Sequence, residues 1–231
     1  MSAALQSMPR QGGRVSVAVQ KLETSDQALY GDQAYDTASI VKVDILAALL
    51  LQAQEARRSL AAQERAYATA MIKISDNVAT TALWRAIGGA AGLDAVNKRL
   101  GLTETMAGKN GNWGLTQTTA KDQLRLLQQV FGSDAVLSKA ARDYIQELMG
   151  DVADGQDWGI STAGSHTALK NGWLPRSTTG MWDVNSIGRV RVDRQDYLIA
   201  VLSDGNRTQA EGIARIEAAA RAVASAIHAP P

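Results

Sequence analysis

The chain has 231 residues, which suffice for one large domain or two small ones. Hydrophobic residues make up 45% of it and charged residues 20%, which is usual for globular proteins. The formal net charge of +1, without a basic run, gives no reason to expect nucleic acid or an anionic membrane as partner. The absence of cysteine excludes disulfides, thiolate metal sites and cysteine catalysis. The two histidines, His166 and His228, are too few for a histidine-rich metal site and are expected at the surface or in packing. We therefore expect neither metal nor cofactor.

The first part of the chain has the pattern of a short sheet. Residues 1–10 are expected to form either a short helix or an N-terminal segment without regular secondary structure. Residues 14–19 alternate with a period of two, which indicates a strand, and residues 27–30 are its expected hairpin partner. No run of about 18 apolar residues occurs, so no membrane-spanning segment is predicted.

The middle of the chain has a helical pattern. We find no convincing strand between residues 39 and 171, although residues 166–169 alternate in hydrophobicity. The predicted helices cover residues 39–55, 60–74, 78–87, 91–100, 120–131 and 135–149. This run of helices predicts a separate helical lobe.

Strand patterns return near the end of the chain. Residues 182–192 and 197–203 are rich in β-forming residues, and residues 208–227 form a final amphipathic helix. The simplest arrangement is one antiparallel sheet built from both ends of the chain, with the helical lobe inserted between them. We therefore predict one α+β domain over residues 1–231. Its sheet lobe covers about 1–38 and 160–231, its helical lobe covers about 39–159, and a ligand cleft is expected where they meet.

The first predicted helix begins with a candidate nucleophile and base. Ser39 and Lys42 are three residues apart, so on a helix they share a face and the Lys42 amine can reach the Ser39 hydroxyl. The apolar neighbours Ile40, Val43 and Ile45 desolvate Lys42 and favour its neutral, basic form. The helix N-terminus also offers backbone N–H groups to a developing oxyanion. A serine cap followed by a snorkelling lysine is the structural alternative.

Two later motifs decide between these explanations. Ser75-Asp76-Asn77 precedes a predicted helix, and Lys170-Asn171-Gly172 ends the alternating stretch at residues 166–169. The order S-x-x-K, S-D-N and K-[T]-G is typical of class A β-lactamases and penicillin-binding proteins. The chain resembles that superfamily, and class A most closely, from about residue 15 to about residue 227. The resemblance implies a β-lactamase-like fold, in which the sheet from both chain ends flanks the helical lobe.

The resemblance also implies roles for the reacting groups. Ser39 is expected to be the nucleophile and Lys42 its base. Ser75 would relay a proton to the leaving group, and Lys170 would supply positive charge for Ser75 and for a substrate carboxylate. Asp76 is expected to be structural, because an aspartate in a turn bonds its own backbone.

Four further residues are expected to bind substrate. Asn77 resembles the family residue that contacts both the lysine and the substrate. Gly172 would let the substrate approach the backbone, and the N–H of Trp173 would join that of Ser39 in holding the oxyanion. Asn171 stands where the family usually has Thr or Ser. Its amide can donate a hydrogen bond, but its different geometry is expected to weaken recognition of a carboxylate.

The largest departure from the family lies at residues 102–119. Class A β-lactamases carry there a long loop whose glutamate activates the deacylating water, in a pattern such as Glu-x-x-Leu-Asn. The segment in this chain is short, lacks that pattern, and has Glu104 as its only carboxylate. We therefore expect a class A-like framework without the usual deacylation residue.

These observations predict a serine hydrolase that forms an acyl-enzyme on Ser39 from an amide, ester or peptide and turns over β-lactams poorly or not at all. The alternatives are a true β-lactamase with a displaced general base, an acyltransferase or D-alanyl carboxypeptidase-like enzyme, and a binding protein without catalysis. The expected partner is a small-molecule or peptide substrate, and the chain is expected to be a monomer. Without a signal-peptide pattern in residues 1–13 it is expected in the cytoplasm, or outside it if a leader has been removed.

Overall fold

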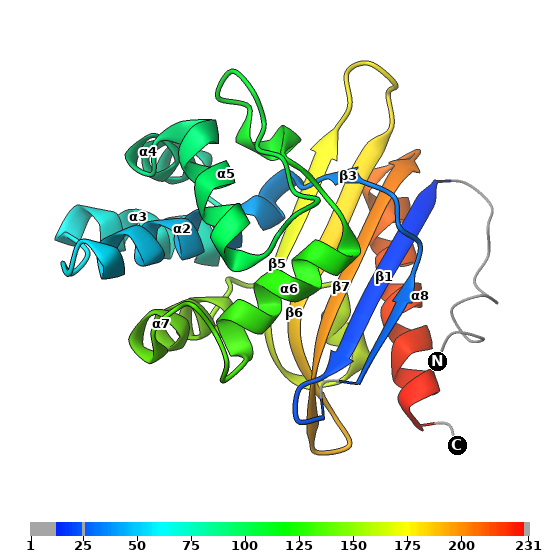
Figure 1. The fold of residues 1–231 in the computed structure, drawn as a ribbon. Coiled ribbons are helices and arrows are strands. Elements are labelled where there is room, and N and C mark those ends of the chain that lie inside the picture. The colour runs from blue at the N-terminus through cyan, green and yellow to red at the C-terminus, as the bar shows by residue number, and fades with distance from the viewer. Residues whose placement is uncertain (1–12, 25, 229–231) are drawn as a thin grey trace.

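A sheet and a helical lobe lie side by side in the computed structural model, which describes residues 13–24 and 26–228 (Figure 1). The prediction for residues 1–10 concerns a segment that lies outside the described residues. The described residues form a five-stranded antiparallel sheet in the order β2-β1-β7-β6-β5. Its strands are β1 (Arg14–Lys21), β2 (Gln27–Tyr30), β5 (Ser165–Pro175), β6 (Trp182–Val192) and β7 (Gln195–Asn206). The sheet is therefore built from both ends of the chain, as the sequence predicts.

The helical lobe consists of the segments between the two halves of the sheet. Its helices are α2 (Val41–Glu55), α3 (Ala62–Lys73), α4 (Asn77–Ala86), α5 (Gly89–Leu100), α6 (Ala120–Phe131) and α7 (Lys139–Gly150). The prediction of a helix over 135–149 is wrong at its start. Ser138 caps α7 by accepting a hydrogen bond from the N–H of Ala141 at 3.3 Å, so the helix begins at Lys139.

Strand pairing within the middle region was also missed. β5 begins at Ser165 and continues through Lys170 to Pro175, and two short strands, β3 (Tyr35–Asp36) and β4 (Gln117–Thr118), pair with each other. Two residues are too few to show a hydrophobic period, so a pattern cannot reveal β3 or β4. Their pairing brings the segment before Ser39 next to the segment that follows residue 116.

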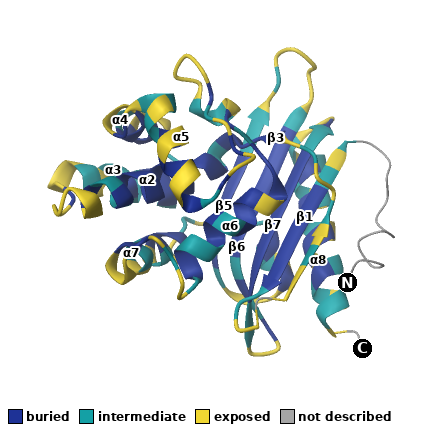
Figure 2. Cartoon of the chain, in the orientation of Figure 1, coloured by how far each residue is buried: buried dark blue, intermediate teal, exposed yellow. Residues whose placement is uncertain are grey.

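Each face of the sheet is covered by a different part of the chain. Along β7, Leu198 and Leu202 face the helical lobe, whereas Ile199 and Val201 face α8 (Gln209–His228). This alternation follows from the two-residue period of a strand. Figure 2 shows the result: the central strands and α2 are buried, and exposed residues collect on the outer helices and loops.

Helix α2 is the centre of the helical lobe. Its residues are buried on nearly every side, which is the pattern expected of a helix surrounded by protein. Because η1, the 3₁₀ helix Ala38–Ile40, precedes α2 directly, this core fixes the position of Ser39. No helix among the described residues has the length and hydrophobicity that a membrane span requires.

Candidate functional site

The candidate nucleophile lies in a short turn at the start of the buried helix. Ser39 belongs to η1, and α2 begins at Val41, two residues later than predicted. Residues 38–40 form the 3₁₀ helix η1 in place of the first α-helical turn, and η1 begins at Ala38, whose φ of 48° is left-handed. This conformation costs a non-glycine residue about 1–2 kcal/mol. Strain of this kind is concentrated at functional sites, where the surrounding structure imposes it.

Lys42 is a fully buried amine with three oxygen partners. Its Nζ lies 2.6 Å from the carbonyl oxygen of Ser75, 2.9 Å from the Ser75 hydroxyl and 2.9 Å from Oδ1 of Asn77. The Trp113 ring covers the amine, with its centroid 5.1 Å from Nζ. Burial lowers the pKa of Lys42 to about 7, against a smaller opposing attraction from Asp76. Both the neutral and the charged form of the amine are therefore accessible near pH 7.

The partners of Lys42 suit both of its protonation states. Two of them are carbonyl oxygens, which only accept, so they need N–H donors whether the amine is charged or neutral. The third is the Ser75 hydroxyl, which accepts from the ammonium and can donate to the lone pair of the neutral amine. A proton can therefore move between Lys42 and Ser75 without leaving an unpaired group. Among the described residues these partners, rather than the Ser39 hydroxyl, take up the N–H groups of Lys42.

A helix cap holds the Ser75-Asp76-Asn77 motif in place. Asp76 is the N-cap of α4 and accepts a hydrogen bond from the N–H of Ala79 at 2.6 Å, which is the structural role that we expected. Ser75 has a φ of 57°, and its carbonyl and hydroxyl oxygens both contact Lys42. Asn77 opens α4, so the cap also fixes the third partner of the lysine.

Lys170 is a second buried amine, on edge strand β5. It is 1% exposed, and its Nζ donates to the carbonyl oxygen of Asn171 at 3.0 Å. Burial, and then the positive charge of Lys42, lowers the pKa of Lys170 to about 7. Among the described residues, neither lysine has a carboxylate within hydrogen-bond or ion-pair distance. Two neighbouring amines in this environment favour the neutral, basic form, as acid–base chemistry requires.

Gly172 brings β5 close to the candidate nucleophile Ser39. A Cβ atom at this position would lie 2.7 Å from the backbone nitrogen of Ser39 and 2.8 Å from that of Ile40, closer than real Cβ atoms come. From the sequence, Gly172 is expected to let the substrate approach the backbone. The structure gives it an additional reason to be glycine, because it lets the backbones of β5 and η1 touch.

The Asn171 side chain points toward the other face of the sheet, because side chains alternate along β5, whereas Trp173 lies at the edge of the pocket that contains Ser39. Nδ2 of Asn171 donates to the carbonyl oxygens of Gln156 and Trp158, at 2.9 and 2.8 Å. The Trp173 ring packs on that of Trp158, with centroids 6.0 Å apart. The structure thus engages the Asn171 amide in anchoring the preceding loop and does not bring it to the pocket beside Ser39. The oxyanion role of the Trp173 N–H concerns its backbone and stays a prediction.

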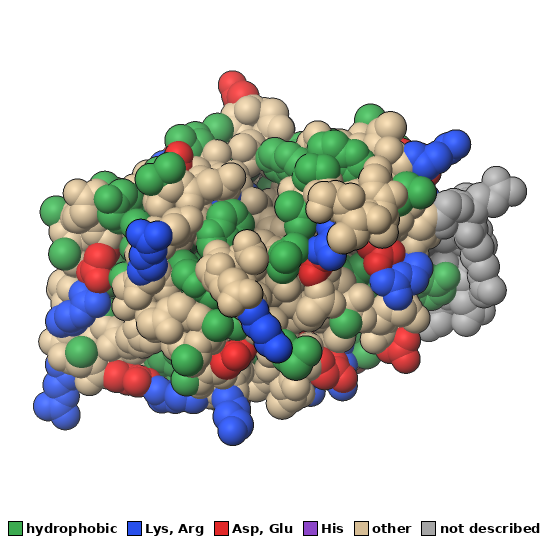
Figure 3. Space-filling model, turned by 90° about the horizontal axis from the view of Figure 1, so that it is seen from above, with side chains coloured by type: hydrophobic (Ala, Val, Ile, Leu, Met, Phe, Trp, Pro, Cys, Tyr) green, Lys and Arg blue, Asp and Glu red, His purple; other side chains and the backbone are tan. Residues whose placement is uncertain are grey.

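A cavity of about 300 Å³, the Ser39 pocket, opens beside the candidate nucleophile. Its lining includes Ser39, Asn77, Trp113, Trp173 and Leu174, and no charged side chain among the described residues lines it. Trp113 is not predictable as a site residue from the sequence, because its contact with Lys42 joins distant parts of the chain and leaves no local pattern. Figure 3 views the molecule from the end at which the β5–β6 hairpin projects, and basic, acidic and hydrophobic side chains are interspersed on this face.

Glu104 is placed away from the Ser39 pocket. Its Oε2 accepts a hydrogen bond from the Thr119 hydroxyl at 3.0 Å, and its backbone N–H donates to the buried Asp122 at 2.7 Å. These contacts fix the short segment at residues 102–119 to the start of α6. The only carboxylate of that segment is therefore not among the residues that line the pocket.

Comparison with known proteins places this geometry in a family context. The chain is similar to the TLA-1 extended-spectrum β-lactamase, with a TM-score of 0.85 and 18% identity over 98% of this chain and 97% of that one. It is also similar to PBP-A, with a TM-score of 0.83 and 22% identity over 98% and 94% of the two chains. At these identities the likeness concerns the fold.

Sequence comparison adds a curated relative and a family. The putative lipoprotein LppW of Mycobacterium tuberculosis (strain ATCC 25618 / H37Rv) is 29% identical over 172 residues, which are 71% of this chain and 55% of the relative. The chain thus spans about half the length of the curated relatives it matches. The model of the β-lactamase enzyme family matches residues 2–66 and 63–227. Together with the fold, this match shows that the chain belongs to the β-lactamase enzyme family.

Proposed function

We propose that the protein is a serine hydrolase that forms an acyl-enzyme on Ser39 and releases the acyl group slowly. The observation that carries the proposal is the hydrogen-bonded cluster of Lys42, Ser75 and Asn77 beside that serine. A buried lysine with a pKa of about 7 is matched to accepting a proton at neutral pH. The substrate would be an amide, ester or peptide small enough to place its carbonyl in the Ser39 pocket.

The first half of the reaction is acylation. Neutral Lys42 takes the proton of the Ser39 hydroxyl as the serine oxygen forms a bond to the substrate carbonyl carbon. Backbone N–H groups of Ser39 and Trp173 stabilise the oxyanion. The proton then passes from Lys42 to Ser75 and on to the leaving group as its bond to the carbonyl carbon breaks, and Ser75 recovers its own hydroxyl. The 2.9 Å contact between Lys42 and Ser75 supports this relay.

The second half needs a water molecule and a base beside the ester. No carboxylate lines the Ser39 pocket within the described residues, and this favours slow deacylation over efficient β-lactamase turnover. The same observation favours a second candidate function, transfer of the acyl group to an amine. An amine is a stronger nucleophile than water and needs less help from a base.

Intact-protein mass spectrometry tests the proposal. The wild type, Ser39→Ala and the control Ser59→Ala, which changes an exposed serine outside the site, are each incubated with penicillin G and with a fluorophosphonate. Penicillin G is a suitable probe because a mutant of the structural neighbour PBP-A has been solved as its acyl-enzyme complex. We expect a stable adduct on the wild type and on Ser59→Ala, and none on Ser39→Ala.

Other outcomes separate the alternatives. Rapid penicillin hydrolysis with only a transient adduct would favour a true β-lactamase with a displaced base. No adduct with either reagent would overturn the enzymatic proposal and favour a binding protein. An adduct that persists in Ser39→Ala would assign the nucleophile to another residue.

A further inference from the structure

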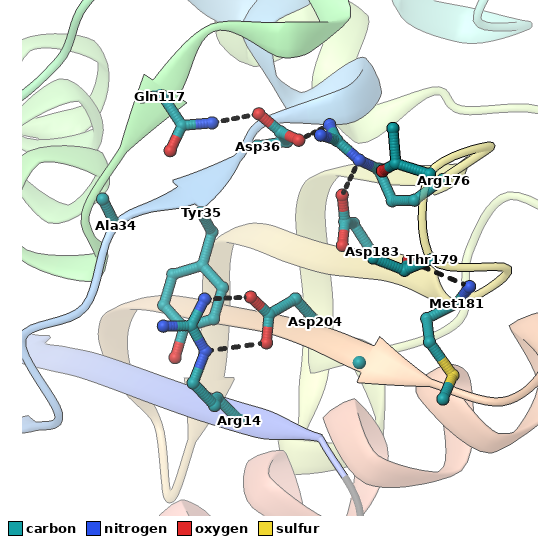
Figure 4. Close-up of a pocket in the computed structure, with 12 residues that line it drawn as sticks. Arg14, Ala34, Tyr35, Asp36, Gln117, Arg176, Thr179, Met181, Asp183 and Asp204 are labelled. Atoms are coloured by element: carbon teal, nitrogen blue, oxygen red, sulfur yellow. Dashed lines mark hydrogen bonds and ion pairs between the residues drawn. The ribbon is translucent and has the colours of Figure 1, made fainter.

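A second cavity lies beside the Ser39 pocket and is used by none of the steps above. It has a volume of about 340 Å³, within the range of ligand sites, and we call it the rim cavity. Its lining includes Arg14, Asp36, Arg176, Thr179, Asp183 and Asp204 (Figure 4). These residues come from β1, β3, β6, β7 and the β5–β6 hairpin, so the folded sheet assembles them from distant parts of the sequence.

The rim cavity lies next to the Ser39 pocket in the direction in which β5 runs. Lys170, Gly172 and Leu174 share one face of that strand, and Gly172 touches Ser39 while Leu174 lines the Ser39 pocket. Leu174 pairs directly with Asp183 of β6. Asp36 is three residues before Ser39, so their Cα atoms are at most about 11 Å apart. The rim cavity therefore lies farther along β5 from Lys170 than Ser39 does, and a substrate whose carbonyl lies at Ser39 can extend its acyl part toward it.

Two of its three carboxylates already have cationic partners. Arg14 donates to Asp204 through Nε at 3.0 Å and through a second nitrogen. Arg176 forms an ion pair with Asp36, which also accepts a hydrogen bond from Gln117. Figure 4 shows both pairs, one on each side of the cavity. Arg176 also lies 3.8 Å from Asp183, so two arginines face three aspartates and the cavity carries one more negative than positive charge.

Asp183 is buried and lacks a hydrogen-bond donor. Its side chain is 7% exposed, no group among the described residues donates to its carboxylate, and its nearest cation, Nε of Arg176, is 3.8 Å away. Burying a carboxylate without donors is costly, and here it raises the pKa of Asp183 to about 6. A ligand that supplies N–H donors and a positive charge would remove this cost.

The complementary ligand is an organic cation and not a metal ion. The described residues contain no group of three or more His, Cys, Asp or Glu side chains that could hold a metal. Asp183 therefore offers one carboxylate, which suits a single ammonium or guanidinium group. Thr179 also lines the cavity, whereas the ring of Tyr35 is already covered by the Arg14 guanidinium, 5.5 Å from its centroid.

We propose that the rim cavity binds an ammonium or guanidinium group on the acyl part of the substrate, with Asp183 as its counter-ion. This inference rests on the proposed function, because it assumes that the acyl carbonyl lies at Ser39. It narrows the substrate class to amides, esters or peptides whose acyl part carries a positive charge.

The first test measures binding without any reaction. Butylammonium and butylguanidinium are titrated into the protein and followed by amide chemical shifts, with butanol and butyrate as matched neutral and anionic probes. We expect the cations alone to shift the amides around residue 183. Asp183→Asn should weaken their binding by about tenfold or more, the effect of losing one charged hydrogen-bond partner. The control Asp143→Asn, on an exposed face of α7, and Ser39→Ala should bind as the wild type does.

Wild-type protein provides a second measurement if Asp183→Asn fails to fold. Protonation of Asp183 below pH 6 removes its charge, so the cations should bind more weakly at pH 5 than at pH 8. The other charged groups around Asp183 are Arg14, Arg176, Asp36 and Asp204, which form the pairs Arg14–Asp204 and Arg176–Asp36, and Arg176 is also 3.8 Å from Asp183. Equal affinities at the two pH values, or no cation binding in the wild type, would overturn the proposal.

The final test links the cavity to catalysis. Phenyl octanoate and phenyl 8-aminooctanoate are compared as acyl donors for Ser39 by mass spectrometry. We expect the amino ester to acylate the wild type and Asp143→Asn faster, and Asp183→Asn to lose that preference. A preference that survives in Asp183→Asn would refute the inference. If neither ester labels the wild type, the proposed function fails, and cation binding alone then decides whether the cavity is a site.

Discussion

A β-lactam bound to Ser39 should leave slowly, and the structure allows an estimate of how slowly. Fast hydrolytic enzymes turn over at about 10²–10³ per second, and general-base assistance contributes about 10²–10⁴-fold. No carboxylate among the described residues lines the Ser39 pocket, and Glu104 is hydrogen-bonded to Thr119. Without that assistance, deacylation is expected on the order of 0.01–10 per second.

The assay is a pre-steady-state measurement with a chromogenic cephalosporin. We expect a burst equal to the enzyme concentration, followed by the slow rate given above, with the adduct visible by mass spectrometry during the slow phase. The perturbation is Glu104→Gln, which should leave the slow rate within about twofold of that of the wild type. If Glu104 gives no general-base assistance, replacing it removes none. Turnover of hundreds per second in the wild type would refute the reasoning. A large loss of rate in Glu104→Gln would identify the base that we exclude.

Three further substitutions probe the site and its support. Lys42→Met keeps most of the buried volume but removes the amine, so Ser39 labelling should slow by about 10²–10⁴-fold, and normal labelling would exclude Lys42 as the base. Gly172→Ala places a methyl group 2.7–2.9 Å from backbone atoms of residues 37–40. Urea unfolding should therefore show a free energy of unfolding lower by about 1–3 kcal/mol, and labelling of Ser39 should slow. An unchanged free energy of unfolding would contradict the close contact. Burial raises the pKa of Asp44 from 3.8 to about 8, so its contribution to stability is complete below pH 3.8 and is lost as the pH rises toward 8. The melting temperature of Asp44→Asn relative to that of the wild type should therefore rise between pH 5 and pH 8. If this difference in melting temperature stays constant over that range, Asp44 does not become charged in the folded protein as argued.

The fold was predictable where a local pattern and a local stop signal coincide. The predicted helix over 120–131 matches α6, because Thr119 caps it at the start by accepting from Asp122 at 3.1 Å. The predicted strand over 182–192 matches β6. By contrast, helix 135–149 was predicted too early, since Val136 and Leu137 continue the apolar pattern ahead of the cap at Ser138.

The site was predictable only where residues act through motifs. The ordered motifs place Lys42, Ser75 and Asn77 in one cluster, and the structure brings those three side chains together. The orientation of Asn171 depends on the register of β5, and the position of Trp113 depends on a contact across the fold. Neither leaves a periodic signal in the sequence, so both required coordinates.

The pairing of β1 with β7 has a consequence during synthesis. Their register joins Arg14 to Asp204 and Lys21 to Tyr197, although almost the whole chain separates them. At translation rates of about 5–20 residues per second, β1 waits roughly 10–35 seconds before β7 has been made. During that time Val17 and Val19 lack the α8 side of their core, and one edge of β1 stays open for pairing with other chains. The helical lobe is therefore synthesised before the strands β5, β6 and β7 that complete the sheet, and α8, which covers the far face of that sheet, is made after them.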